Sequence, residues 1–391
     1  MIELTILMPC LDEAETLEVC ISRGRELLER HAINGEILIS DNGSTDGSQE
    51  IARRCGARVV DWPIRGYGAA LQFGIDQAQG KYVLMGDSDD SYHFEEAFPL
   101  IQKLRDGYDV CMGTRLNGKI MPKAMPFLNR YLGNPVLSGI GKIFFRTGLS
   151  DFHCGMRAFK REAILSIGLV TTGMEWASEM VIKSALHRLT MTEVPITLYK
   201  DGRNRPPHLR RWRDGWRHLR FMLIHAPTWL FTIPGIVLFS LGTLLGSLLA
   251  NGPVQIGKAE LDIHTLLVMS SFIILGMQSI FTGLFVNLYG HLLGILPINS
   301  TFRKVSSILS LEKLLILALI LGVFGATLFG YNCLKWYQAD FPHLDARATM
   351  RQIIPALTML TLSAQCFFNG FMLSTLYLST KKISYDNLAN S

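Results

Sequence analysis

Short apolar runs alternate with amphipathic stretches through the first half of the chain. Each run ends at a polar or turn residue, as buried strands do, and the stretches between them place apolar residues at helical spacing. Strands are predicted over residues 4–8, 36–40, 57–62, 81–86 and 108–115. Helices are predicted over 13–30, from a cap near Ser44 or Thr45, and over 67–79. This alternation predicts an α/β fold with a doubly wound, mostly parallel sheet.

In a doubly wound sheet, ligands bind beyond the carboxyl ends of the strands. The predicted strands end at or just before Pro9, Asp41, the acidic cluster Asp87–Asp90 and Arg115. We therefore expect these residues to lie along one edge of the sheet.

The second half of the chain has a different pattern, with long apolar runs that lack Asp, Glu, Lys and Arg. Buried core helices would be the alternative, but a series of runs that each reach the roughly 20 residues needed to cross a bilayer favours an all-α region of four transmembrane helices. The predicted spans are 227–250, 263–290, 314–334 and 352–380. They divide the chain into a catalytic domain (1–202), a basic amphipathic juxtamembrane segment (203–226), the membrane region (227–380) and a short tail (381–391).

Composition and charge give this division an orientation. The chain has 391 residues and 49% hydrophobic residues, and its first residues resemble no signal peptide because acids follow a short apolar run. Lysines and arginines at 303–304 and 381–382 agree with a positive-inside arrangement, whereas those at 258, 335, 347 and 351 oppose it. Seven cysteines without metal-ligand spacing fit a reducing compartment. We expect a multi-pass protein of the inner (plasma) membrane with a cytoplasmic catalytic domain and C-terminus.

The acidic cluster allows two interpretations. Asp87 and Asp89 could present oxygens to Mg²⁺ or Mn²⁺, which proteins hold with one or two carboxylates plus substrate phosphates, or the cluster could be a solvated turn. Asp41 could likewise accept from a nucleobase N–H or form an Asx-turn. Gly66 and Gly68 open a helix, either as a phosphate cradle or as a tight turn.

Four stretches together resemble the successive motifs of inverting GT-A glycosyltransferases of family 2, and within that family the dolichol- and polyprenyl-phosphate sugar synthases. They are PCLDE (9–13), DNGSTDGS (41–48), GYGAALQFGIDQAQGKYVLMGDSD (66–89) and MGTR (112–115). The likeness covers roughly the first 220 residues. It implies a GT-A fold and a membrane-bound hexosyltransferase that moves a sugar from a UDP- or GDP-linked donor to a polyprenyl phosphate such as undecaprenyl phosphate, with inversion.

The same resemblance implies roles for individual residues. Asp89 would ligate the metal that bridges the diphosphate, Asp151 would be a base or orienting carboxylate, and Arg157 would clamp the lipid phosphate. The nucleotide sugar would contact Pro9, Leu11, Glu13, Asp41, Gly68, Asp87, Ser88 and Arg115. Asp12 replaces the usual Asn of its motif, and Asp90 is either a supporting carboxylate or a cap.

The acceptor side is predicted from charge. Residues 110–150 contain no acid, but basic residues alternate with apolar and aromatic ones, which favours an anionic membrane surface over a solvated helix pair. Seven arginines follow between 203 and 220, and tryptophans at 212 and 216 are typical of a juxtamembrane anchor. The arginines expected to contact the acceptor phosphate are Arg130, Arg157, Arg203 and Arg205.

Three further features leave alternatives open. Glu175 and Glu179 share a helical face, so one could face the sugar or both could be structural. His153 and Cys154 resemble a metal pair but have no further ligands nearby. The spans contain histidines only near their ends, so they are interpreted as an anchor and oligomerisation surface, which leaves a homo-oligomer open.

Two other functions compete with lipid-linked sugar synthesis. HLRRW (208–212) comes close to a motif of processive polysaccharide synthases of the same fold, but its first residue is His and no spans precede the catalytic domain. A non-enzymatic lipid-linked-sugar flippase with a nucleotide-binding head is the other. The basic residues are assigned to a lipid bilayer, and no nucleic-acid partner is expected.

Overall fold

The computed structural model describes residues 2–203, 211–293, 295–296, 310–341 and 343–389, with side chains as far as Tyr377 apart from that of Arg211. The chain forms two compact units, Met1–His225 and Ala226–Ser391. The described residues of the predicted juxtamembrane segment, up to His225, therefore belong to the first unit.

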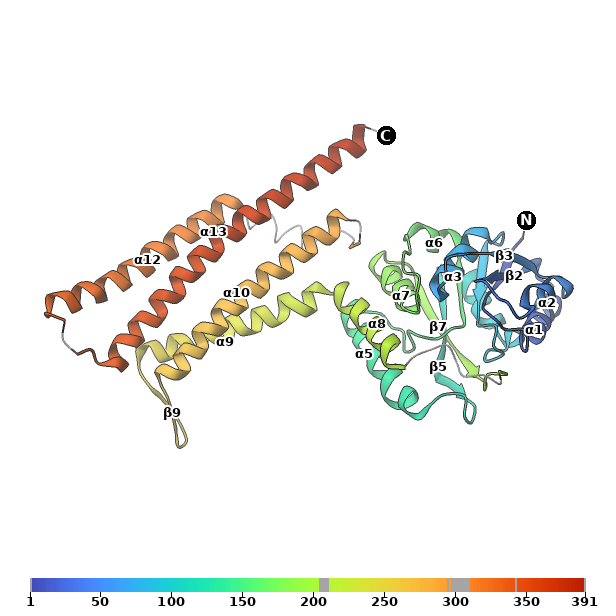
Figure 1. The fold of residues 1–391 in the computed structure, drawn as a ribbon, viewed down its shortest axis with the longest axis horizontal. Helices are drawn as coiled ribbons and strands as arrows, with labels where there is room; N and C mark the ends of the chain where they lie inside the picture. The colour runs from blue at the N-terminus through green and yellow to red at the C-terminus, as the bar shows by residue number, and fades with distance from the viewer. Residues whose placement is uncertain (1, 204–210, 294, 297–309, 342, 390–391) are drawn as a thin grey trace. The chain divides into compact units, whose positions relative to one another are not determined.

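The first unit is built on a seven-stranded sheet with the order β3-β2-β1-β4-β6-β5-β7 (Figure 1). Every neighbouring pair is parallel except those that involve β6, which is antiparallel to both β4 and β5. The strands are β1 (Leu4–Cys10), β2 (Gly35–Asp41), β3 (Arg58–Asp61), β4 (Tyr82–Met85), β5 (Val110–Ile120), β6 (Arg157–Lys160) and β7 (Met191–Leu198). The predicted doubly wound, mostly parallel sheet is confirmed.

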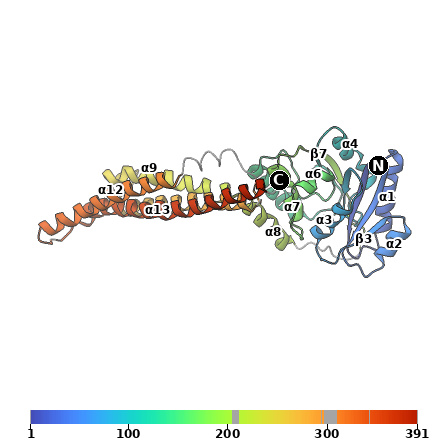
Figure 2. The same cartoon turned by 90° about the horizontal axis from the view of Figure 1, so that it is seen from above.

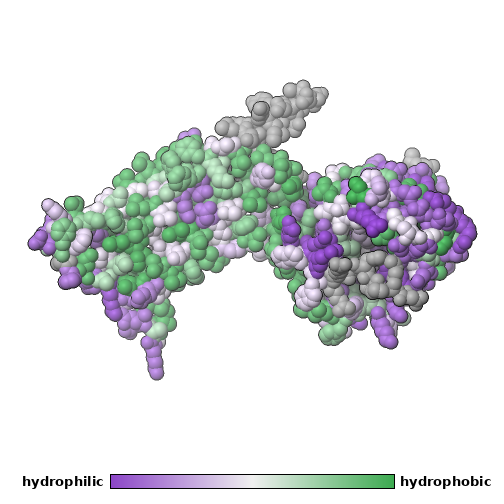
Figure 3. Space-filling model, in the orientation of Figure 1, coloured by the Kyte–Doolittle hydropathy of each residue, from purple (hydrophilic) through white to green (hydrophobic). Residues whose placement is uncertain are grey.

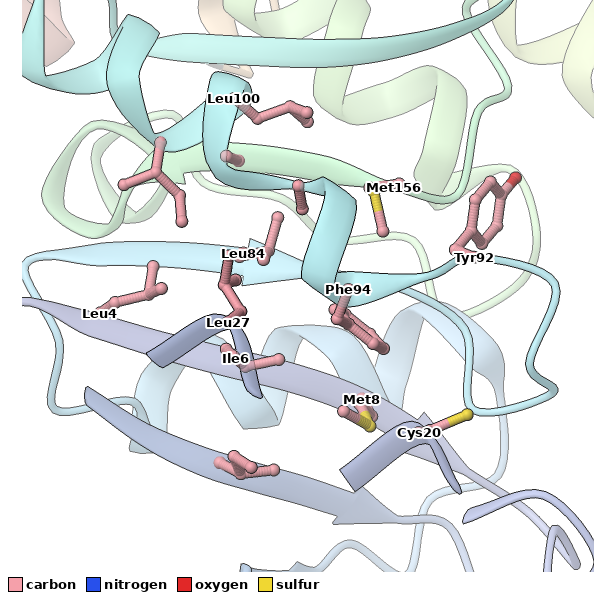
Figure 4. Close-up of a cluster of buried hydrophobic side chains, with 14 of the residues drawn as sticks. Leu4, Ile6, Met8, Cys20, Leu27, Leu84, Tyr92, Phe94, Leu100 and Met156 are labelled. Carbon is pink, nitrogen blue, oxygen red and sulfur yellow. The ribbon is translucent and has the colours of Figure 1, made fainter. Parts of the chain in front are cut away.

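Helices cover both faces of this sheet because strand residues alternate between the two sides. Leu4, Ile6 and Met8 of β1 pack with residues of α1 and α4, as Figure 4 shows, whereas Leu7 belongs to the cluster on the opposite face with residues of α3 and α7. The helices of the unit are α1 (Leu17–Arg30), α2 (Ser48–Arg54), α3 (Tyr67–Gln77), η1 (Phe94–Glu96), α4 (Phe98–Arg105), η2 (Asn129–Gly133), α5 (Asn134–Phe145), α6 (Arg161–Ser166), α7 (Trp176–Leu186) and α8 (Arg211–Ile224).

The structure differs from the sequence predictions at several places, and two of them are close to the predicted strand ends. The predicted helix cap near Ser44 or Thr45 is wrong, because α2 begins at Ser48 after Gly47, whose φ is 89°. Strand β6 was not predicted; lying between β4 and β5, it leaves β5 parallel to β4. Arg115 lies within β5, which continues to Ile120 beyond the predicted strand end, at the irregularity between Thr114 and Lys119. Its side chain lies close enough to Asp87 to lower the pKa of that carboxyl.

The second unit consists of long apolar helices that run alongside one another. Helix α9 packs on α10, α12 packs on α13, and contacts between α10 and α13 join the two pairs (Figures 1 and 2). The elements are η3 (Thr228–Thr232), α9 (Ile233–Asn251), the hairpin β8 (Val254–Ile256) and β9 (Ala259–Leu261), α10 (Ile263–Leu292), α12 (Leu311–Gln338) and α13 (Ala346–Ala389).

Four of these helical segments are long and apolar enough to cross a membrane. They are Thr228–Asn251, Ile263–Leu292, Leu311–Gln338 and Ala346–Tyr377, and each overlaps a predicted span. The face of the unit that Figure 3 shows is mostly hydrophobic, and Leu319 and Phe368 are more than 60% exposed, as lipid-facing residues are. The protein is a multi-pass membrane protein.

Candidate active site

Hydrogen bonds between side chains and backbone join the loops that follow β1 and β2. The Thr45 N–H donates to Asp12 Oδ1 at 2.7 Å, and the Asp12 N–H donates to Ser44 Oγ at 2.8 Å. The Glu13 N–H donates to Ser48 Oγ at 2.9 Å. Asp12 has a φ of 55°, a backbone conformation that Asp tolerates better than most residues. Asp12 thus holds the two loops together.

Asp41, the last residue of β2, is fully buried and only half satisfied. Its Oδ2 accepts from the N–H groups of Gly43 and Ser44, both at 3.0 Å, and from Gln49 Nε2 at 2.8 Å. Its Oδ1 is buried and has no hydrogen-bond partner among the described residues. The Asx-turn and the binding role are therefore compatible, because one oxygen forms the turn and the other is left to accept a hydrogen bond.

Asp87 lies just after β4 in a setting that disfavours its charge. Burial and the neighbouring charge of Asp89 raise the pKa of Asp87 to about 6. The hydroxyl of Tyr67, the first residue of α3, donates to Asp87 Oδ1 at 2.9 Å and opposes this rise. A cation placed at these two carboxylates would relieve the repulsion between them.

Asp89 is paired with an arginine from a distant part of the chain. Its Oδ2 lies 2.7 Å from an Arg203 nitrogen, and another Arg203 nitrogen lies 3.0 Å from Glu13 Oε1. Its Oδ1 accepts from the N–H and the hydroxyl of Ser91 at 3.1 and 2.5 Å. A guanidinium cation thus occupies the position between Asp89 and Glu13.

Ser88 and Asp90, the two neighbours of Asp89 in sequence, each contact another part of the catalytic unit. The Ser88 hydroxyl is buried and donates to the Pro9 carbonyl at 2.7 Å, which gives it a role in joining β1 to the acidic loop rather than the predicted contact with the sugar donor. Asp90 has a φ of 61° and pairs with Arg23 of α1 at 3.0 Å. Asp90 is therefore a supporting carboxylate that fastens the loop to α1.

The glycines before α3 are explained by close packing. A Cβ at Gly68 would lie 2.6 Å from the Thr171 carbonyl oxygen, and one at Gly66, where φ is 147°, would lie 2.1 Å from the Thr172 oxygen. The N-terminus of α3 is thus pressed against the loop that precedes α7. This contact supports the tight-turn interpretation, and the contact of Gly68 with the nucleotide sugar stays a prediction.

Arg115 and Asp151 form a bidentate ion pair beside the acidic loop. Arg115 Nε lies 2.7 Å from Asp151 Oδ2, and its Nη2 lies 2.8 Å from Asp151 Oδ1. The Arg115 side chain is 11% exposed and that of Asp151 is fully buried. The charge of Arg115 holds the pKa of Asp151 below its ordinary value, although burial alone would raise it. A group with a lowered pKa and both oxygens paired is a poor base, so these contacts favour the orienting role among the two predicted for Asp151.

Arg157 does not reach any site. Its side chain is fully buried, and its guanidinium donates to the carbonyl oxygens of Cys154 at 2.8 Å, Ala177 at 2.8 Å and Phe152 at 3.2 Å. The predicted clamp on the lipid phosphate is therefore corrected: this arginine holds β6, α7 and the turn that precedes β6 together.

Comparison with known proteins identifies the family. The sequence family Glycosyl transferase family 2 matches residues 5–168, and the Glycosyltransferase family 2 C-terminal transmembrane region matches residues 284–377. The low-salt glycan biosynthesis hexosyltransferase Agl6 of Haloferax volcanii is 34% identical over 95% of this chain and 89% of its own length. The chain belongs to glycosyl transferase family 2.

Two further proteins are similar to part of this family 2 glycosyltransferase. The dolichyl-phosphate hexose transferase of Haloferax volcanii is 32% identical over 41% of this chain and 68% of its own length. The glucosyl-3-phosphoglycerate synthase of Mycobacterium tuberculosis, crystallised with Mn²⁺, UDP and glucosyl-3-phosphoglycerate, is 22% identical over 58% of this chain and 78% of its own, with a TM-score of 0.43.

The residues at the end of β4 fit a divalent cation. Asp87 and Asp89 supply the hard oxygen ligands that Mg²⁺ and Mn²⁺ prefer, and their mutual repulsion raises the pKa of Asp87. Within the described residues, no group of three or more His, Cys, Asp or Glu side chains could form a ready-made metal site. The fit is therefore to an ion held by one or two carboxylates together with substrate phosphates.

One residue at this edge, Tyr67, was not predicted to belong to the site of this family 2 glycosyltransferase. Its hydroxyl, on the first residue of α3, donates to Asp87, and nothing in the sequence near Gly66 and Gly68 indicated this contact. Glu175 precedes α7, and its Oε2 is buried without a hydrogen-bond partner among the described residues, whereas Glu179 is paired with Lys183 and bonded to Thr171. The two glutamates thus separate into one structural residue and one residue with a buried, unused acceptor.

The remaining predicted contacts are placed as follows. Arg130, on η2, is partly exposed and its guanidinium lies 5.4 Å from the centre of the Tyr131 ring. Pro9 is the next-to-last residue of β1, and Leu11 lies beside Asp12 in the loop that follows. Arg205 lies outside the described residues.

Proposed function

We propose that this protein transfers a hexose from a nucleotide-diphosphate sugar to a polyprenyl phosphate, with inversion at the anomeric carbon, to give a lipid-linked monosaccharide. The observation that carries the proposal is the strained acidic pair Asp87–Asp89 at the carboxyl edge of the sheet, faced by Arg203. The membrane-spanning unit and the name of the dolichyl-phosphate hexose transferase support a lipid acceptor, and the name of Agl6 supports hexose transfer.

The donor would lie across the ends of β1, β2 and β4. Asp41 Oδ1 would accept an N–H of the base, and Glu13 would line the nucleotide pocket. Asp89, with Asp87 beside it, would hold Mg²⁺ or Mn²⁺, and when bound this ion would offset the negative charge that develops on the departing diphosphate. Tyr67 orients Asp87 for the ribose or the sugar.

Arg203 links the donor to the acceptor. Its guanidinium neutralises Asp89 and Glu13 in this structure, and it would have to leave Asp89 for this carboxylate to hold a divalent cation. The freed guanidinium can then form paired hydrogen bonds to phosphate oxygens of the acceptor. This exchange favours an order in which the nucleotide sugar binds before the lipid phosphate.

The acceptor needs positioning more than deprotonation. A phosphate oxygen of the lipid is already anionic near neutral pH, so holding it in line with the anomeric carbon is the main contribution expected of the protein. Arg115, fixed by Asp151, presents its partly exposed side chain beside Asp87, and Arg130 is a second cationic candidate. A single displacement by that oxygen inverts the anomeric centre.

The catalytic unit is placed, by this proposal, on the cytoplasmic side of the plasma membrane, where the product would serve cell-envelope glycan or glycoconjugate synthesis. The alternative, a processive polysaccharide synthase, uses the same fold. In this chain the stretch HLRRW (208–212), which comes close to the motif of those synthases, lies partly outside the described residues. The non-enzymatic alternative is set aside by membership of a transferase family.

The test is a transfer assay on membranes that contain the full chain. Membranes are incubated with undecaprenyl or dolichyl phosphate, Mn²⁺ or Mg²⁺, and a panel of radiolabelled UDP- and GDP-sugars, with membranes of the Asp89→Asn variant as control. Label in the organic phase that depends on the added lipid phosphate and on Asp89 supports the proposal. Label found only in polymer would favour the processive synthase, and transfer to neither would contradict both.

A further inference from the structure

Helix α8 has its apolar and polar faces reversed relative to a helix on the surface of a soluble domain. Its buried face carries Asp214, His218 and His225 beside Met222, all less than 9% exposed. Its outer face carries Trp212, which is 83% exposed, with Trp216 at 59% and Ile224 at 50%. A helix that turns tryptophans outward and histidines inward is built to lie against an apolar medium on its outer side.

A buried chain of hydrogen bonds fastens this helix to the catalytic unit. The Ser178 hydroxyl of α7 lies 2.8 Å from His218 Nδ1 and 3.0 Å from His153 Nε2. A hydroxyl can donate to one ring nitrogen and accept from the other, so one serine joins the two histidines. The rings themselves stand edge to face with their centres 4.4 Å apart.

His153 belongs to the turn that holds the acceptor-side ion pair. The His153 N–H donates to Asp151 Oδ1 at 3.3 Å, and the Phe152 N–H donates to Ser138 Oγ of α5 at 3.2 Å. On its other side the turn touches the donor site, since a Cβ at Gly155 would lie 2.4 Å from Asp87 Oδ2. The turn 151–155 therefore includes Asp151 of the pair with Arg115, and it contacts Asp87 and helix α5.

We propose that Ser178 and His218 are positioning residues that couple the seating of α8 on a lipid surface to the placement of the Asp151–Arg115 pair. The occupant of the outer face of α8 is a bilayer with anionic headgroups. Arg213 and Arg217, whose side chains are 55% and 41% exposed, supply the complementary charge, and the first membrane-spanning segment begins at Thr228, four residues after α8 ends.

The exposed surface of α5 and η2 extends this argument. Phe127, Tyr131 and Leu132 are 77%, 60% and 55% exposed, and Ile143 is 57% exposed. Helix α5 contacts α8 and, through Ser138, the same turn. Helix α5 is thus bonded to the turn that holds Asp151 through Ser138, and α8 is joined to it through Ser178.

The experiment measures hydrogen exchange of the turn 151–155 in the full chain reconstituted into nanodiscs. Discs of phosphatidylcholine alone are compared with discs that also contain phosphatidylglycerol, so the spans stay in a bilayer while the charge that attracts α8 changes. In the wild type, phosphatidylglycerol should slow exchange of the turn by about tenfold. Ser178→Ala and His218→Leu should lose most of this slowing.

Two variants make the result specific. His225 lies on the same buried face of α8, but its Nδ1 bonds to the Phe221 carbonyl of its own helix, so His225→Leu should keep the slowing. His218→Asn, which can place an amide group near the position of Nδ1, should restore it. Exchange in β1 reports the intact fold; if Ser178→Ala also loosens β1, the contrast between His218→Leu and His218→Asn decides.

The proposal is overturned if anionic lipid does not slow the turn in the wild type, if Ser178→Ala and His218→Leu keep the slowing, or if His225→Leu loses it equally. The inference rests on the proposed function only where it assigns Asp151–Arg115 to the acceptor. Because exchange requires no sugar transfer, its failure is distinguishable from failure of the transfer assay. With both intact, His218→Leu should raise the KM for polyprenyl phosphate about tenfold and leave UDP affinity unchanged.

Discussion

Two pairs of side chains, Asp87 with Asp89 and Asp151 with Arg115, have opposite electrostatic surroundings. Asp87 and Asp89 lie together, and burial with the repulsion between them raises the pKa of Asp87 to about 6. Asp151 is fully buried, yet its pKa is lowered because Arg115 pairs with both of its oxygens. We propose that the first pair would receive a metal cation in place of the Arg203 guanidinium that faces Asp89, whereas Asp151 keeps its protein counter-ion. The same residue type would then bind a ligand at one place and support the structure at the other.

The largest effect is expected at Asp89. Asp89→Asn keeps the size of the side chain and an oxygen for Ser91 but removes the charge that would hold the cation, and the loss of several kcal/mol of transition-state stabilisation corresponds to a decrease of about a thousandfold in kcat/KM for sugar transfer. Transfer assays across a range of Mn²⁺ concentrations measure this. Activity within a few fold of wild type at every concentration would remove Asp89 from the metal site.

Asp151→Asn should affect the fold more than the chemistry. The Arg115 guanidinium would keep its charge in a nearly buried position without a counter-ion, which typically costs about 3–5 kcal/mol. Urea unfolding of the catalytic unit, followed by tryptophan fluorescence, measures the loss. Glu18→Gln is the control, since Glu18 and Arg54 form a pair more than 60% exposed and its removal should cost less than about 1 kcal/mol. Equal losses in the two variants would contradict the assignment of Asp151 as a structural counter-ion.

Asp87→Asn should do the opposite and stabilise the unbound protein. Replacing a buried charge beside Asp89 should raise the free energy of unfolding by about 1–3 kcal/mol at neutral pH, while Tyr67 can still donate to the new amide oxygen. Binding of UDP with Mn²⁺ should weaken in the same variant. A variant less stable than wild type at neutral pH would show that Asp87 is not held under electrostatic strain.

The pH dependence follows from the sign of the shift. Since the pKa of Asp87 is about 6 in the folded state and near 4 when unfolded, the folded protein binds more protons between these values. The cost of its buried charge is therefore fully present above pH 6 and fades as the pH falls toward 4. The stability difference between Asp87→Asn and wild type should shrink over that window, and Mn²⁺ affinity should fall with it as protons compete for the carboxylate.

The sequence predicted the first pair better than the second. Apolar runs that end at acids placed Asp41 and Asp87 at strand ends, and parallel strands bring such ends to one edge whatever the details of packing. Arg157 was misassigned because the sequence shows a basic residue near Asp151 but not which way it faces. Its position at the start of β6, an antiparallel strand that was not predicted, directs it into the core.

Contacts between residues far apart in sequence account for most of what the sequence could not show. Arg203 reaches Asp89 over more than a hundred residues, and Ser178 joins His153 to His218. Neither contact follows from periodicity or spacing, because each depends on how a loop or helix packs after the sheet has formed. The spans were easier to predict, since a bilayer requires long runs of apolar residues regardless of packing.

The smallest effect is expected at Asp90, which completes the contrast with its neighbour. Asp90→Asn removes a partly exposed ion pair with Arg23 but keeps a residue that tolerates the φ of 61°. The free energy of unfolding should fall by less than about 1 kcal/mol, and kcat/KM should stay within a few fold of wild type. Measured in parallel with Asp89→Asn, this variant tests whether catalysis depends on one particular carboxylate or on the total negative charge of the loop. A loss as large as that of Asp89→Asn would favour the total charge and would contradict the assignment of Asp90 as a residue that only fastens the loop to α1.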